Sequence, residues 1–126
     1  MTVISLFSGC GGLDLGFERA GFKIPVANEF DPTIFETFKA NHPQTHLVEG
    51  DIRQVTKEDI SPYLSEEVDG IIGGPPCQSW SEAGSLRGIN DARGQLFFDY
   101  IRTRKETSGL EDWETDASCR TEPKNL

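Results

Sequence analysis

Short runs of apolar residues recur along the first part of the chain, and two of them are followed by helical spacing of apolar positions. Four strands are predicted, over residues 3–7, 23–28, 45–49 and 68–72. Between the first two strands, Leu13, Phe17 and Ala20 share one helical face, which predicts a helix over 13–20 that ends at Gly21. Strands that alternate with helices are typical of an α/β domain with a parallel sheet.

A second helix is predicted to begin at Asp31, a favourable N-cap that precedes Pro32 at the first helical position. Apolar residues continue the pattern at helical spacing, and the helix is expected to end near Asn41. The mixed, polar stretch over residues 53–67 predicts no regular element of its own.

Beyond the fourth strand, residues 78–93 are rich in small polar residues and glycine, which predicts a loop. An amphipathic helix is expected over 96–102. Residues 103–126 carry scattered charges and little apolar periodicity, which is typical of a poorly ordered tail. The pattern therefore predicts one domain over residues 1–102 and a divergent tail over 103–126.

Candidate cofactor-binding residues follow three successive strands. The first strand runs into the glycine-rich segment 8–12, where glycines permit a tight turn and a helix start offers free N–H groups. Such a turn alone is equally typical of a connection that binds nothing. Glu29 ends the second strand, where doubly wound folds place an acid on ribose hydroxyls, and Asp51 follows the third, where it could accept from an adenine amino group. Either acid alone is better explained as a solvated residue at a strand end, but the three features together favour a nucleotide-like cofactor.

Cys77 follows the fourth strand and the segment Gly73-Gly74-Pro75-Pro76. The carboxyl ends of parallel strands line the ligand crevice, so this thiol is expected beside the cofactor. A cysteine near a helix start can have a lowered pKa and act as a nucleophile. The alternative is a buried structural cysteine, and it fits poorly because the neighbours are Gly, Pro, Gln and Ser.

The three cysteines form no Cys-x-x-Cys pair and have no histidine at ligand spacing, so neither a disulfide framework nor a metal site is expected. No apolar run is long enough to span a membrane, and the first residues lack the features of a signal peptide. A soluble, cytoplasmic protein is therefore expected.

The segments 7–13, 28–31, 50–52, 74–79 and 91–98 together resemble the motifs of the DNA cytosine-5 methyltransferase family, in family order and spacing. The resemblance covers about residues 1–102. It implies a Rossmann-like S-adenosyl-methionine-dependent methyltransferase fold that is incomplete at the C-terminus. It also implies S-adenosyl-methionine as the cofactor and double-stranded DNA as the partner. A bacterial member would be associated with the nucleoid.

The resemblance assigns roles to individual residues. Cys77 would add to carbon 6 of a flipped cytosine so that carbon 5 can accept the methyl group, and residues 78–90 would close over the base. The residues implied to surround S-adenosyl-methionine are Phe7, Gly9, Gly11, Gly12, Leu13, Glu29, Phe30, Asp51, Ile52, Pro75 and Leu96. The candidates for contact with the substrate DNA are Gln78, Ser79, Ser81 and Arg87. Ser79, Ser81 and Arg87 are equally well explained as solvated loop residues.

The chain departs from the family after Arg102, where the Glu-Asn-Val motif, the Arg-x-Arg pair and the target-recognition domain are not found. Most DNA contacts are expected in that part, because a chain of net charge -9 binds duplex DNA poorly by itself. The isolated chain is therefore expected to be inactive. Either a complementary C-terminal chain completes the enzyme or the gene product is truncated, and the abrupt loss of pattern favours truncation.

Three other functions compete with this one. A catalytically silent cofactor-binding fragment, or a subunit of a split methyltransferase, is the main alternative. An amino-group methyltransferase is disfavoured, because those enzymes resemble this layout but carry Asn/Asp-Pro-Pro-Tyr/Phe where this chain has Gly74-Pro75-Pro76-Cys77. An RNA cytosine substrate stays open, although the Pro-Pro-Cys-Gln context favours DNA.

Overall fold

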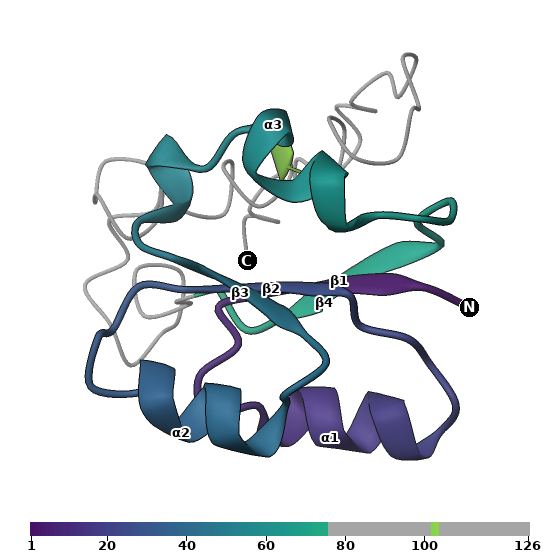
Figure 1. The fold of residues 1–126 in the computed structure, drawn as a ribbon, viewed down its shortest axis with the longest axis horizontal. Coiled ribbons are helices and arrows are strands. Elements are labelled where there is room, and N and C mark those ends of the chain that lie inside the picture. Colours follow the sequence, from purple (N-terminus) through teal and green to yellow (C-terminus); the bar gives the residue numbers. More distant parts are fainter. Residues whose placement is uncertain (76–101, 104–126) are drawn as a thin grey trace, which may run out of the picture.

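A single parallel sheet organises the computed structural model, which describes residues 1–75 and 102–103 (Figure 1). Within these residues the strand order is β3-β2-β1-β4, and every neighbouring pair is parallel. The strands are β1 (Val3–Leu6), β2 (Val26–Glu29), β3 (His46–Glu49) and β4 (Gly70–Gly73). The chain moves outward from β1 to β3 and then returns to the other side of β1. This reversal places a topological switch point between β1 and β4, where open α/β sheets bind ligands.

Helices cover both faces of the sheet. Helix α1 (Gly12–Arg19) follows β1 and helix α2 (Phe35–Asn41) follows β2, and both lie on the same face (Figure 1). The opposite face is covered by α3 (Lys57–Ile60) with the short 3-10 turns η1 (Ile52–Gln54) and η2 (Ser61–Tyr63). The predicted α/β architecture is therefore confirmed.

The largest apolar cluster lies between the sheet and the α3 layer. Its buried members are Ile4, Leu6, Val26, Ile52, Val55, Ile60 and Val68. Two of them, Val55 and Ile60, come from the stretch 53–67, for which the sequence predicted no element. The expectation of no element was wrong. The apolar residues there are spaced too irregularly to show a helical or strand period, and they form a core only by packing against β1 and β2.

The buried face of α1 also differs from the prediction. Leu13 is 48% exposed, Phe17 is only half-buried, and Ala20 is exposed. The buried residue of the helix is Asp14, at 1% exposure, whose Oδ1 accepts a hydrogen bond of 2.8 Å from the Ser5 hydroxyl. A polar contact with β1 thus decides which side of this short helix faces the sheet.

Helix α2 begins one turn later than predicted, at Phe35. Oδ1 of Asp31 accepts hydrogen bonds from the N–H and the hydroxyl of Thr33, at 2.9 and 2.7 Å. Asp31 therefore stabilises a local turn instead of capping the helix, a competition that is common for this residue type. The end of the helix at Asn41 agrees with the prediction.

Only Arg102 and Thr103 are described in the last part of the chain, and both are helical. The Arg102 guanidinium donates to the carbonyl oxygens of Ile52, at 2.8 Å, and Val55, at 3.1 Å. Thr103 is buried, at 1% exposure. The predicted loop over 78–93 lies outside the described residues, and the domain boundary at residue 102 with its following tail stays a prediction.

Replacing Gly73 with alanine should destabilise the domain, because a Cβ at this position would lie 2.0 Å from the backbone oxygen of Leu6. Two paired strands cannot separate locally without losing ladder hydrogen bonds, so we expect a loss of about 1–3 kcal/mol in the free energy of unfolding. Gly70→Ala is the control in the same strand, since its Cβ would lie 3.9 Å from Val3 Cγ1, an ordinary contact. Urea unfolding of both variants measures the difference, and equal stability of the two would contradict the prediction.

Candidate cofactor-binding site

The turn after β1 is shaped by residues with positive φ. These are Phe7 at 55°, Gly9 at 57° and Gly11 at 82°. The Ser8 N–H donates to the carbonyl oxygen of Asn28 at 3.1 Å, and the Gly11 N–H donates to that of Ser8 at 3.0 Å. Positive φ is uncommon for a residue other than glycine, and such conformations cluster at functional sites. The left-handed Phe7 therefore identifies this turn as a candidate functional site.

The carboxylate of Glu29 joins the turn to the end of β2. Oε2 accepts the Gly9 N–H at 2.7 Å, and Oε1 accepts the N–H groups of Phe30 at 2.8 Å and Asp31 at 2.9 Å. The backbone oxygen of Glu29 also accepts the Gly50 N–H at 2.9 Å, which brings in the segment after β3. A carboxylate can accept about four hydrogen bonds, so with these three contacts it retains capacity for one donor from a ligand.

Asp51 follows β3 and caps η1. Its Oδ1 accepts the Arg53 N–H at 2.9 Å and the Arg53 Nε at 3.0 Å, and Arg53 also forms an ion pair with Oδ2. Hydrogen bonds from the Arg53 side chain and backbone hold the pKa of Asp51 below its ordinary value of 3.8. Asp51 is therefore a carboxylate at neutral pH, which an acceptor for an amino group requires.

The structure brings most of the predicted cofactor residues to one edge of the sheet. Phe30 is 66% exposed, Leu13 and Gly12 are exposed, and Pro75 follows β4. Ile52 differs, because its side chain is 2% exposed and packs in the core cluster. The predicted residues that lie outside the described part of the chain are Cys77, Gln78, Ser79, Ser81, Arg87 and Leu96.

Sequence reasoning missed two buried polar residues, Asn28 and Asp14, that make side-chain hydrogen bonds near this edge. The Asn28 side chain is buried, and its Nδ2 donates to the carbonyl oxygens of Val48 at 2.8 Å and Gly50 at 3.0 Å. Burial raises the pKa of Asp14, whose Oδ2 has no hydrogen-bond partner within the described residues. Nothing in the sequence identifies Asp14, because an acid between two leucines in a helix resembles a solvent-facing residue.

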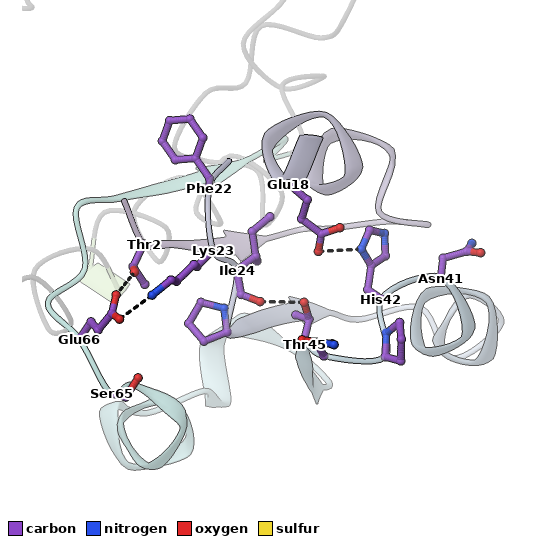
Figure 2. A pocket seen from close by; sticks show the side chains of 13 residues that line it. Thr2, Glu18, Phe22, Lys23, Ile24, Asn41, His42, Thr45, Ser65 and Glu66 are labelled. Atoms are coloured by element: carbon purple, nitrogen blue, oxygen red, sulfur yellow. Dashed lines mark hydrogen bonds and ion pairs between the residues drawn. The ribbon is translucent and has the colours of Figure 1, made fainter. Parts of the chain in front are cut away.

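Two cavities in the described part of the chain lie away from this edge. One, of about 480 Å³, is lined by Glu18, Lys23, His42 and Glu66 among others (Figure 2). The other, of about 660 Å³, runs along β3. Neither is lined by a predicted cofactor residue.

The described residues include no cluster of three or more His, Cys, Asp or Glu side chains able to hold a metal ion. None of the helices among them is long and apolar enough to cross a membrane.

Substituting glutamine for Glu29 should weaken the joint between the strand ends. One terminal atom of glutamine is an amide donor, so it cannot replace an oxygen that accepts an N–H group. We expect a loss of about 1–3 kcal/mol in the free energy of unfolding, measured in urea. The matched control is Glu49→Gln at the end of β3, where an exposed ion pair with Lys39 should contribute less than about 1 kcal/mol. A comparable effect of the two substitutions would refute the role given to Glu29.

Comparison with known proteins adds to this geometry. Residues 1–109 match the sequence model of the C-5 cytosine-specific DNA methylase family. The chain is 75% identical over 105 residues to the type II methyltransferase M.NgoPII of Neisseria gonorrhoeae, covering 83% of this chain and 30% of the relative. It is 62% identical over 106 residues to M.FnuDI of Fusobacterium nucleatum, covering 84% and 29%.

A solved structure shares the fold. It is described as a candidate DNA modification methyltransferase encoded within a prophage of E. coli, and it is similar with a TM-score of 0.70 at 38% identity. The match covers 85% of this chain and 29% of that one, so the chain spans about 30% of the length of the relatives it matches. The Rossmann-like methyltransferase fold and the resemblance inferred from the motifs are confirmed. The chain belongs to the C-5 cytosine-specific DNA methylase family.

Proposed function

We propose that this chain is the cofactor-binding and nucleophile-bearing part of an enzyme that transfers a methyl group from S-adenosyl-methionine to carbon 5 of cytosine in DNA. One observation carries the proposal. The glycine turn, the end of β2 and the segment after β3 meet at Glu29, within a chain whose residues 1–109 match the family. The type II methyltransferases among its relatives support a role in restriction-modification.

The residues at this edge fit the chemical parts of the cofactor. The remaining acceptor capacity of Glu29 suits a ribose hydroxyl. The Asp51 carboxylate suits the adenine amino group, which would replace one of its contacts with Arg53. The exposed ring of Phe30 offers a face for a purine. A Cβ at Gly9 or Gly12 would meet nothing within 4 Å, so a ligand can approach the backbone there. When bound, S-adenosyl-methionine supplies an electrophilic methyl group on a sulfonium sulfur.

Cys77 is proposed as the nucleophile, because Pro75 stands at the carboxyl edge beside β1 and the family motif continues to residue 77. Carbon 5 of cytosine is a weak nucleophile in the intact aromatic ring. Attack of the thiolate on carbon 6 forms a carbon–sulfur bond and moves electron density onto carbon 5, which then takes the methyl group. Loss of the carbon 5 proton and expulsion of the thiolate restore the ring. The base must first be flipped out of the duplex.

We further propose that DNA is held mainly by protein outside this chain. A net charge of -9 opposes binding to phosphates, and the chain spans about 30% of its relatives. The proposed domain covers residues 1–102, with 103–126 as a divergent tail, and the isolated chain is proposed to be inactive. The same two observations favour one alternative, a silent cofactor-binding fragment or subunit.

Phe30→Ala should lower the affinity for S-adenosyl-methionine about tenfold, because loss of one aromatic face removes on the order of 1–3 kcal/mol of stacking with a base. Isothermal titration calorimetry measures the change. Tyr63→Ala is the control, since Tyr63 is another exposed aromatic residue, at 45% exposure, but stacks on His46 away from this edge. Equal losses in both variants would argue against an adenine site at Phe30.

Covalent trapping tests the proposed chemistry. Residues 1–105 are joined to the remaining part of M.NgoPII and mixed with DNA that contains 5-fluorocytosine, whose fluorine cannot leave as the carbon 5 proton does. The chimera should form an adduct that survives denaturing electrophoresis, and Cys77→Ala should form none. Cys10→Ala, which removes an exposed thiol in the glycine turn, should keep the adduct.

Two results would contradict parts of this proposal. Methylation by the Cys77→Ala chimera at an undiminished rate would exclude the covalent step. An adduct formed by the isolated chain would show that it needs no further protein, and it would also remove the silent-fragment alternative.

A further inference from the structure

His42 lies directly beneath the glycine turn. It follows the last residue of α2, and only 3% of its surface is exposed. Gly11, the N-cap of α1, adopts φ 82° beside it. A Cβ at Gly11 would lie 2.2 Å from His42 Nε2 and 2.5 Å from its Cδ2, so the ring leaves no room for even a methyl group.

The imidazole is held from two further sides. It stacks on Phe38 with ring centroids 4.7 Å apart and an interplanar angle of 27°. Its Nδ1 lies 3.1 Å from Oε1 of Glu18, a contact drawn in Figure 2. Glu18 is in the last turn of α1, and Gly11 caps the first, so the single His42 ring contacts both ends of α1. The ring therefore cannot move away from the turn without breaking the stack or the Glu18 contact.

Gly11 is the point at which the turn becomes a helix. Its N–H donates to the Ser8 carbonyl oxygen at 3.0 Å, and its own carbonyl oxygen accepts the Leu15 N–H at 2.9 Å. Displacing Gly11 would shift the backbone of the segment Gly9–Gly12. The backbone of Gly9 and Gly12 faces open space, since a Cβ at either would meet nothing within 4 Å. The position of this backbone is thus set on one side by Glu29 and on the other by His42.

We propose that His42 is a positioning residue for the glycine turn, filling the space under Gly11 and so fixing the backbone that meets the cofactor. The proposal rests on the proposed function in one respect, that this turn is where S-adenosyl-methionine binds. It assigns to His42 no contact with the cofactor and no proton transfer.

A double-mutant cycle between Gly11→Ala and His42→Ala tests the proposal through the dissociation constant for S-adenosyl-methionine. We expect His42→Ala alone to weaken binding about fivefold, since the backbone loses its support. Gly11→Ala alone should weaken it by more than about fiftyfold. In the His42→Ala background the same glycine substitution should weaken it only about fivefold, the residual cost of a left-handed alanine.

Two matched variants separate positioning from general loss of packing. His46→Ala removes the second of the two histidines, which stacks on Tyr63 with ring centroids 3.6 Å apart and should leave affinity unchanged. Glu18→Gln keeps an acceptor for the His42 ring and should also retain affinity. Strictly additive effects of Gly11→Ala and His42→Ala, or unchanged affinity in His42→Ala, would overturn the proposal.

Urea midpoints of the four proteins in the cycle form an independent readout. Gly11→Ala should lower the midpoint much more with His42 present than with alanine there, and additive shifts would overturn the contact itself. If none of the four proteins, the unmutated chain included, binds S-adenosyl-methionine, the proposed function of the chain fails. The urea cycle still decides whether His42 fixes Gly11.

Discussion

The hydrogen bonds of one carboxylate hold the candidate site together. Glu29 accepts three backbone N–H groups, one from the turn after β1 and two from the turn after β2, and its carbonyl oxygen accepts a fourth from the segment after β3. Together with the Ser8–Asn28 backbone bond and the side-chain bonds of Asn28, these contacts hold the carboxyl ends of β1, β2 and β3 at one edge. Since these bonds are made within the protein, the edge is shaped before any ligand arrives, and ordering of the loops does not have to be paid for at binding.

The opposite side of the glycine turn depends on side chains that do not reach the ligand edge. Ser5 of β1 donates to Asp14, and His42, which follows α2, contacts Gly11, so α1 is fixed against the sheet and against its neighbouring helix. Burial of Asp14 raises its pKa and is therefore unfavourable for the charged form. Its place in the core is best explained by geometry, because this helix buries no other residue of its own range that could fix its rotation. Support of this kind from a second layer is what keeps a binding backbone in place.

The sequence predicted the parts of the fold that follow from local pattern. The four strands, the glycine turn and Glu29 at a strand end were all recognisable, because apolar runs and glycine clusters are read within a few residues. The α3 layer was missed, since Ile52, Val55 and Ile60 have no common period and only the sheet makes them a core. The start of α2 was misplaced because Asp31 satisfies its own turn. The contacts of Glu29 with Gly9, and of His42 with Gly11 and Glu18, join distant segments, which no local pattern encodes.

The acidic composition also has a structural explanation. Several carboxylates accept backbone N–H groups at the ends of elements, as Asp51 does from Arg53, Asp59 from Thr56 and Asp69 from Thr2. These acids satisfy backbone N–H groups at the ends of elements, so part of the acidic composition serves the fold. The carboxylates still repel phosphate, and the charge of -9 would have to be offset wherever duplex DNA approaches this edge. A protein segment that completes the proposed enzyme must therefore be basic on the surface it presents to DNA, whether it continues this chain or belongs to another.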